Sequence, residues 1–211
     1  MTSRWICIFF VFKRNNGKLS LKRGVCLEGD FRDPDERMVH EFLSGNADAF
    51  AEILERYKNL VLNVAYRFLQ DRTEAEDVTQ DVFLNVYRSA KTYKPRAKFS
   101  TWVYKITANI CLNRLRDKKE FPKADLKSDC LLNPSSRLSP PEELERKELQ
   151  KIVKTALMSL PSSQRMAVIL KKYQGLSYHE IAEVMSCSIP AVESLLQRAK
   201  NNLRETLRPF L

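Results

Sequence analysis

Apolar residues recur at intervals of three and four along most of the chain, which is the period of one face of an α-helix. The most regular stretch covers residues 50–68 and predicts one long helix with a single buried face. A shorter apolar stripe over residues 38–43 predicts a helix before it, with Asp33 as the N-cap and Pro34 as the first helical residue. No stretch shows the alternation of apolar and polar residues that is typical of a half-buried strand.

Two more helices are predicted before residue 118. Thr73 and Glu76 have the spacing of a capping box and predict a helix that ends near Arg88. Ser100 is the predicted N-cap of the next helix, which ends near Asp117. The residues predicted to face inward from these two helices are Ala75, Val78, Val82, Val86, Val103, Ile106 and Ile110.

Residues 119–141 interrupt the helical pattern. They contain four prolines and charges of both signs, which is typical of a flexible linker. Beyond the linker the pattern predicts four helices. The first covers 144–160, and the second is capped by Ser162 or Ser163 and stops before Gly175. The third starts at a capping box of Ser177 and Glu180, and the fourth starts at Ser188, has Pro190 just inside it and ends near residue 207.

The predicted fold class is therefore all-α, with two small four-helix domains at 34–118 and 142–211 joined by the linker at 119–141. Residues 1–33 show no helical period and hold seven positive and three negative charges. We interpret them as a basic N-terminal extension that is flexible, or as the result of a wrongly assigned start codon, rather than as a functional arm.

The last two predicted helices have the spacing of a helix-turn-helix unit, in which the second helix lies in the major groove of DNA. Residues 185–188 form the short connection, and Ser186 stands where this turn usually has glycine. An ordinary antiparallel helix pair is the alternative. The apolar residues placed to join the two helices are Ile181, Ala182, Met185, Val192 and Leu195.

The exposed face of the second helix carries side chains that suit DNA. Serine, glutamine and asparagine can bind base edges, and arginine and lysine suit phosphates or guanine. Glu193 lies on the same face and would repel phosphate. The residues predicted to face DNA are Pro190, Ala191, Ser194, Gln197, Arg198, Lys200 and Asn201.

The composition adds a basic surplus to this picture. The 211 residues carry a formal net charge of +10, which favours a polyanionic partner. Within the first domain the charge is split, because residues 34–81 have a net charge of −6 and residues 82–123 one of +9. The acidic half is unsuited to DNA phosphates, so we expect it to contact a protein.

The helix predicted to end near Arg88 has an outward face with a single apolar residue, Leu84, among polar neighbours. We interpret it as a docking surface for a partner helix; a solvated face with one stray leucine is the alternative. The other residues of this face are Asp77, Gln80, Asp81 and Arg88.

The basic half contains aromatic residues between its cations, as single-stranded nucleic acid binding requires: bases stack on the rings and the cations follow the backbone. The alternative is that Phe99 and Trp102 only pack in the core. The cluster consists of Lys91, Tyr93, Lys94, Arg96, Lys98, Phe99, Trp102, Tyr104 and Lys105. It is followed by a polar stripe of Lys105, Asn109, Asn113 and Arg116, suited to duplex or melted DNA.

Motifs for other classes of protein are missing from the sequence. Five widely spaced cysteines without a C-x-x-C pair favour a reducing compartment, so we expect a cytoplasmic protein. The longest apolar run has eight residues, and a membrane span needs about 20. His179, Glu180 and Glu183 only approximate a zinc motif, because the second histidine is absent. We expect no metal, no cofactor, no small-molecule substrate and no catalysis.

Three segments in this order resemble the extracytoplasmic function (ECF) sigma factors of bacterial RNA polymerase, within the sigma-70 family. DRTEAEDVTQDVFLNVYR at 71–88 resembles the helix that binds the polymerase clamp, and FSTWVYKITANICLNRLR at 99–116 resembles the segment that melts and recognises the minus-10 element. LPSSQRMAVILKKYQGLSYHEIAEVMSCSIPAVESLLQRAKNNLR at 160–204 resembles the domain that binds the minus-35 element.

The resemblance implies roles for individual residues. The residues it assigns to clamp binding are Asp77, Gln80, Asp81, Phe83 and Leu84. The residues it assigns to minus-10 recognition and melting are Tyr93, Lys94, Trp102, Tyr104, Lys105, Asn109 and Arg116. Of these, Tyr93 and Lys94 lie in the loop that receives a flipped base in this family. The residues it assigns to minus-35 recognition are Ser194, Gln197, Arg198 and Lys200. Many relatives carry a basic residue at the position of Glu193.

The resemblance predicts an alternative sigma factor whose partners are core RNA polymerase and promoter DNA, both duplex and single-stranded. Members of this family are often held by an anti-sigma factor, and no residue here identifies one. A helix-turn-helix repressor that binds DNA without polymerase is the main alternative, and it would leave the acidic face and the aromatic loop without a role. A DNA recombinase is a weaker one, because no nucleophile surrounded by arginines stands out.

Overall fold

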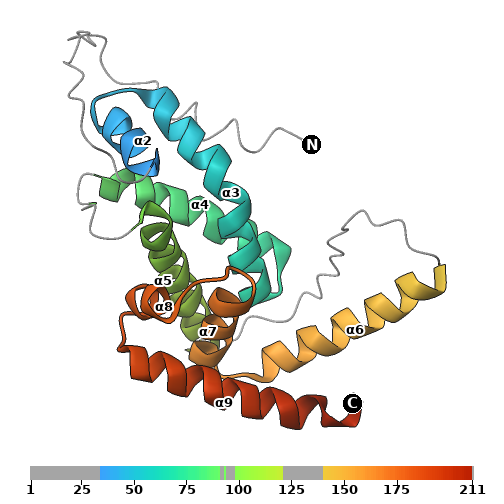
Figure 1. Ribbon diagram of the computed structural model, residues 1–211. Coiled ribbons are helices and arrows are strands. Elements are labelled where there is room, and N and C mark those ends of the chain that lie inside the picture. Colours follow the sequence, from blue (N-terminus) through green and yellow to red (C-terminus); the bar gives the residue numbers. More distant parts are fainter. Residues whose placement is uncertain (1–33, 91–92, 94–97, 121–139, 211) are drawn as a thin grey trace. The chain divides into compact units, whose positions relative to one another are not determined.

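The computed structural model describes residues 34–90, 93, 98–120 and 140–210, and every element within these ranges is a helix (Figure 1). The extension at 1–33, Lys94 and linker residues 121–139 lie outside the described residues. The elements are α2 (Pro34–Leu43), α3 (Ala47–Leu69), α4 (Arg72–Ser89), α5 (Phe99–Glu120), α6 (Pro140–Ser159), α7 (Ser162–Lys172), α8 (Tyr178–Met185), α9 (Ile189–Leu207) and the short 3-10 turn η2 (Arg208–Phe210).

The predicted helices are all present. Local capping explains where α3 begins and where it ends. The side chain of Asn46 accepts a hydrogen bond from the backbone N–H of Asp48 and starts α3. At the other end of α3, Gln70 adopts the left-handed conformation and its N–H donates to the carbonyl of Tyr66, 2.7 Å away. This tight end lets α4 fold back against α3.

Three predicted N-caps lie inside their helices, and α6 begins at Pro140, four residues before its predicted start and within the predicted linker. The N-cap of α4 is Asp71, whose side chain accepts from the N–H of Glu74 at 3.0 Å, so Thr73 lies inside the helix and forms no capping box. Helix α5 begins at Phe99, one residue before its predicted serine cap. The N-cap position of α7 is Pro161, without a side-chain hydrogen bond, and both candidate serines lie within the helix.

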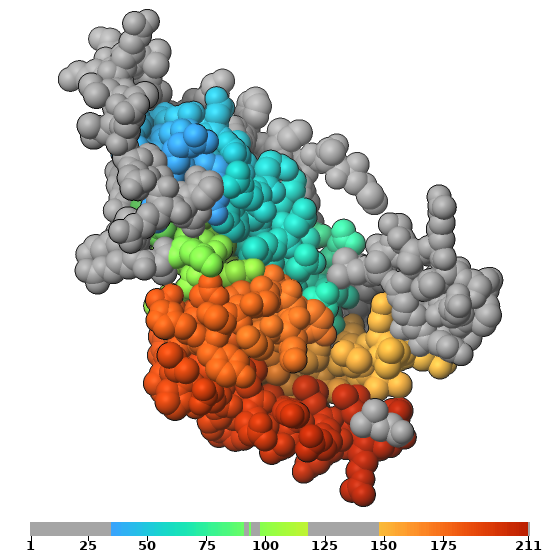
Figure 2. Space-filling model, in the orientation of Figure 1, coloured from blue at the N-terminus to red at the C-terminus, as the bar shows by residue number. Residues whose placement is uncertain are grey.

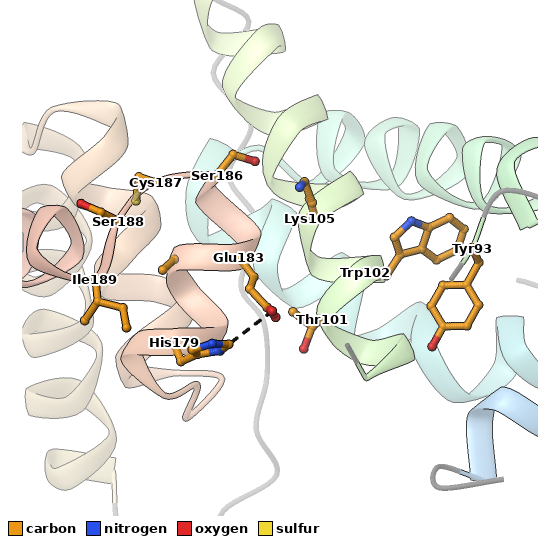
Figure 3. A pocket seen from close by; sticks show the side chains of 11 residues that line it. Tyr93, Thr101, Trp102, Lys105, His179, Glu183, Ser186, Cys187, Ser188 and Ile189 are labelled. Atoms are coloured by element: carbon orange, nitrogen blue, oxygen red, sulfur yellow. Dashed lines mark ion pairs between the residues drawn. The ribbon is translucent and has the colours of Figure 1, made fainter. Parts of the chain in front are cut away.

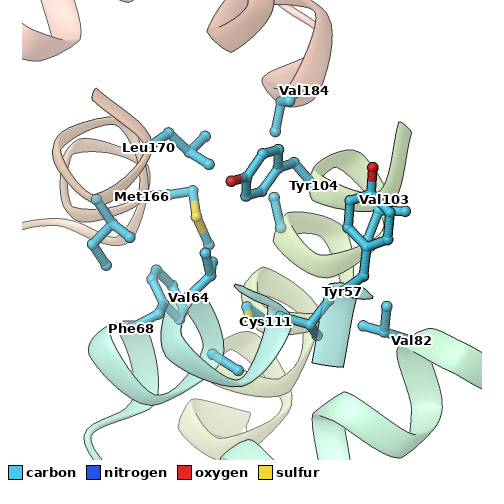
Figure 4. Close-up of a cluster of buried hydrophobic side chains, with 14 of the residues drawn as sticks. Tyr57, Val64, Phe68, Val82, Val103, Tyr104, Cys111, Met166, Leu170 and Val184 are labelled. Carbon is cyan, nitrogen blue, oxygen red and sulfur yellow. The ribbon is translucent and has the colours of Figure 1, made fainter. Parts of the chain in front are cut away.

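The core joins the N-terminal helices to α7 and α8. The predicted inward residues of α4 are buried, and so is Val103 of α5, whereas Ile106 and Ile110 are half-buried. Met166 and Leu170 of α7 and Val184 of α8 belong to the same buried cluster (Figure 4). Helices α3 and α5 contact α7, and α5 also contacts α8, so the described helices from α2 to α9 belong to one compact unit.

The helix-turn-helix unit has the predicted caps. Ser177 and Glu180 form a capping box at the start of α8, and the side chain of Ser188 accepts from the N–H of Ala191 at the start of α9. Between them, Ser186 has a φ of 52°, in the left-handed region. This conformation explains why glycine suits the position.

We expect Ser186→Gly to stabilise the fold by about 0.5–1 kcal/mol, because glycine adopts the left-handed conformation without steric cost. The free energy of unfolding in urea measures the effect. Ser194→Gly, within α9, is the matched control and should destabilise by about 0.5 kcal/mol. Equal changes in both variants would contradict the assignment of backbone strain to Ser186.

Candidate functional site

The outward face of α4 has the predicted surface residues. Asp77 and Leu84 are exposed, and Gln80 and Asp81 are half-buried. Asp81 accepts a hydrogen bond from Arg114 of α5 at 2.6 Å, which raises the pKa of that guanidinium and fixes the carboxylate at the surface. The result is an acidic face that includes the apolar side chain of Leu84, which is 37% exposed.

Phe83 differs from the other residues expected on this face. Its side chain is only 4% exposed and belongs to the core cluster. Successive helical residues point about 100° apart, so Phe83 and Leu84 cannot share one face. In this structure the Phe83 side chain packs in the core, on the buried side of α4.

The aromatic residues before and within α5 form one stacked group. Tyr93, Phe99 and Trp102 have ring centroids 5.2–5.5 Å apart. Phe99 is 1% exposed and is a core residue, as the alternative interpretation predicts. Tyr93 and Trp102 are half-buried at the edge of the group, where they can contact a ligand.

Tyr104 is a second departure from the expected surface. It is 6% exposed, and its hydroxyl donates a hydrogen bond to Oε1 of Gln174, 2.9 Å away. Burial, with a smaller contribution from Glu180, raises the pKa of Tyr104 to about 12. The remaining residues of the predicted stripe are accessible: Lys105 is half-buried, and Asn109 and Arg116 are exposed.

The outward face of α9 is as predicted. Ser194, Gln197, Arg198 and Lys200 are exposed, and so is Glu193. The opposite face packs inward through the buried residues Val192 and Ala199. Nε of Arg198 donates to the carbonyl of Ser194 at 3.3 Å, which leaves the guanidinium on the solvent side of the helix.

A hollow of about 740 Å³ lies between α5 and the turn that joins α8 to α9 (Figure 3). Trp102, Lys105 and Tyr93 line one side. The other side is formed by residues 186–189 with His179, Glu183 and Ala182 of α8. The sequence gives no local sign of this juxtaposition.

His179 and Glu183 lie one turn apart on α8, with Nδ1 and Oε1 separated by 3.9 Å. Within the described part of the chain, no three of histidine, cysteine, aspartate and glutamate gather as a metal site would require. No helix among those described is long and apolar enough to cross a bilayer.

The comparisons with known proteins agree with this geometry. The family model described as Sigma-70 region 2 matches residues 53–121, and the one described as Sigma-70, region 4 matches residues 150–203. The RNA polymerase sigma-H factor of Pseudomonas aeruginosa is 30% identical over 189 residues, which cover 85% of this chain and 97% of that protein. The ECF RNA polymerase sigma-E factor of Escherichia coli is 30% identical over 184 residues, or 84% of this chain and 96% of that protein.

The chain belongs to the ECF sigma factors of the sigma-70 family. It is an alternative sigma factor that takes part in promoter recognition by RNA polymerase. The structure of CnrH in complex with the cytosolic domain of CnrY is similar, with a TM-score of 0.63 and 26% identity over 84% of this chain and 99% of that one. RpoE from Bartonella quintana, in complex with the anti-sigma factor NepR, shares the fold with a TM-score of 0.60 and 24% identity over 75% of this chain and 96% of that one.

The two described cysteines of this ECF sigma factor differ in accessibility. Cys111 is fully buried, and burial raises the pKa of its thiol to about 12. Cys187 lies in the α8–α9 turn and is half-buried beside the hollow.

We therefore expect N-ethylmaleimide to modify Cys187 at least about tenfold faster than Cys111 in the native protein, because the thiolate is the reactive form. Peptide mapping by mass spectrometry measures both rates in one sample. In denaturant the two rates should converge. Equal native rates would show that the α3–α5 core opens as readily as the turn.

Proposed function

We propose that this sigma factor binds the clamp of core RNA polymerase through the outward face of α4. The observation that carries the proposal is the composition of that face: Asp77 and Leu84 are exposed side by side with Gln80 and Asp81, while the opposite face of α4 is buried. An apolar residue within an acidic rim suits a protein surface and not DNA phosphates.

We further propose that α9 binds the minus-35 element as duplex and that α5 binds the minus-10 element as it melts. The exposed polar face of α9 fits a major groove. Tyr93 and Trp102 offer ring faces for an unstacked base, next to the cations of α5. Flipping a base costs a few kcal/mol, which stacking offsets. The chain itself makes and breaks no bond in this scheme.

Transcription start mapping tests the proposal. The purified chain is mixed with sigma-free core RNA polymerase and a fragmented genomic template, and the 5′ ends of the transcripts are sequenced. We expect defined new starts that share elements near minus-10 and minus-35. Sequence-specific DNA binding by the chain alone, with no new starts, would favour the repressor.

Arg198→Ala should reduce transcription from promoters with an intact minus-35 element by about five- to a hundredfold, because one good arginine contact to a base contributes about 1–3 kcal/mol. Run-off transcription from paired templates, with and without the minus-35 element, measures this dependence. Arg204→Ala, an exposed arginine later in α9, is the matched control. Unchanged minus-35 dependence would refute the recognition role of Arg198.

We also propose an anti-sigma factor as a partner and the reducing cytoplasm as the site of action. Two structures similar to this chain contain a bound partner: CnrH is in complex with the cytosolic domain of CnrY, and RpoE is in complex with the anti-sigma factor NepR. Co-purification of the chain from its own cells, followed by mass spectrometry, identifies the partner.

A further inference from the structure

A buried carboxylate in α2 holds a tyrosine that contacts the aromatic residues at the start of α5. Asp35 is only 9% exposed, and it accepts hydrogen bonds from the hydroxyl of Tyr57 and from Nη1 of Arg56, which is 2.5 Å away. The bond from Arg56 raises the pKa of that guanidinium. A buried charge is stable only where such donors meet it, so the carboxylate fixes the donors in place. Both donors belong to α3, and Asp35 lies in the first turn of α2.

The ring of Tyr57 connects this carboxylate to the aromatic residues. Tyr57 is 5% exposed and projects into the buried cluster (Figure 4). It meets the ring of Phe99 edge to face, with the two centroids 5.4 Å apart. Phe99 in turn lies 5.4 Å from the ring of Tyr93 and 5.5 Å from that of Trp102. Aromatic pairs have preferred geometries, so the position of Tyr57 constrains the position of Phe99.

The four rings lead from the core to the surface. Tyr57 and Phe99 are buried, whereas Tyr93 and Trp102 are half-buried and can contact an unstacked base. The Tyr57 hydroxyl is therefore the polar end of a packed series whose other end is the surface proposed for minus-10 DNA. Because protein interiors are close-packed and transmit strain, a shift of the Tyr57 ring moves the outer rings.

We propose that Asp35 and Tyr57 are positioning residues for melting of the minus-10 element. The bond to Asp35 fixes Tyr57, and Tyr57 supports Phe99. Phe99 holds the two outer rings, those of Tyr93 and Trp102, in place for stacking on a base. A platform that is ordered in advance loses less conformational freedom when the base binds. The inference rests on the proposed function for the assignment of the outer rings to DNA.

Helix α2 acquires a role through this arrangement. It contacts both α3 and α5, and it carries none of the residues assigned to DNA or to polymerase. In the space-filling view the blue atoms of α2 lie directly against the cyan atoms of α3 (Figure 2). Helix α2 therefore acts on melting through the side chains packed behind Trp102, without touching DNA itself.

A purely structural role is the alternative. Asp35 would then only fasten α2 to α3, and its loss would lower stability and every activity together. The variant Tyr57→Phe separates the two roles, because it retains the ring against Phe99 and removes only the hydroxyl that bonds Asp35. Val64→Ala is the matched control, since it removes buried apolar volume from the same helix about two turns away.

The position of Trp102 is measured first on the full chain, without polymerase or DNA. The sequence has two tryptophans, so Trp5→Phe leaves Trp102 as the single fluorophore of its kind. Acrylamide quenching of its fluorescence then reports how accessible the ring is. In this background Tyr57→Phe should raise the quenching constant by about twofold, because a region that has lost a buried hydrogen bond opens more often. Val64→Ala should leave the constant unchanged.

Melting is measured next, on the same variants bound to core RNA polymerase. Tyr57→Phe should slow open-complex formation by about two- to tenfold, the fold-change that corresponds to one intramolecular hydrogen bond. Its affinity for core polymerase should stay within about twofold of the unmodified protein. Asp35→Ala should also slow melting, and the combined variant should be no slower than Asp35→Ala alone, because both substitutions act through the same bond.

Both changes are required of Tyr57→Phe, so a change in quenching alone, in melting alone or in neither would overturn the positioning role. Equal losses of melting and of polymerase affinity in Tyr57→Phe and Val64→Ala would assign Tyr57 to stability and overturn it as well. If the unmodified protein with core polymerase melts no promoter, the proposed function fails, whereas the quenching still decides whether Tyr57 positions Trp102. The two failures are thus distinguishable.

Discussion

Trp102→Ala should lower the rate of open-complex formation by about five- to 150-fold and leave the affinity for core RNA polymerase within about twofold. Base stacking on an aromatic ring contributes about 1–3 kcal/mol per base, and the half-buried Trp102 stands at the open edge of the aromatic group. The polymerase-binding face lies on another helix, α4. Permanganate footprinting of melted thymines measures the first quantity, and fluorescence anisotropy of labelled chain measures the second.

Trp102→Phe is the matched control, because it retains a ring for stacking and for contact with Tyr93 and Phe99. It should restore most of the rate. Thermal unfolding of both variants separates a stability loss from a melting defect, since Trp102 also packs on the core. A parallel loss of melting and of polymerase affinity in the alanine variant would refute the melting role.

The helical stripes could be predicted from the sequence because burial of one helix face is a local, periodic property. Val78 and Val82 are buried as their spacing predicts. Helix caps are harder to predict from the sequence than buried stripes. Asp71 and Thr73 both have side chains that can cap a helix, and only the packed structure shows that the cap of α4 is Asp71.

The site could be predicted only where its residues are close in sequence. The exposed face of α9 is such a case. Tyr104 and Gln174 are 70 positions apart, and no local pattern shows that one buries the other. Phe83 and Leu84 are adjacent apolar residues, and which of them faces the core depends on how α4 packs against α3 and α5. Long-range packing therefore determines whether Tyr104 and Phe83 are buried, and for this reason the sequence alone placed them on the exposed side of their helices.

Leu84→Asp should weaken binding to core RNA polymerase by at least about tenfold. An apolar anchor at the centre of a polar rim contributes more than its neighbours to an interface, and an aspartate there also adds a charge that must be desolvated on binding. Leu84 is 37% exposed, so the substitution removes little core packing, and the unfolding temperature should change by only a few degrees.

Leu149→Asp makes the same chemical change at a leucine of α6 that is 60% exposed and remote in sequence from the α4 face. Its affinity for core polymerase should stay within about twofold of the unmodified protein, as measured by anisotropy. If both aspartates weaken binding equally, added negative charge and not the α4 face explains the loss. If neither does, α4 is not the polymerase-binding surface, and the acidic half of the chain needs another partner.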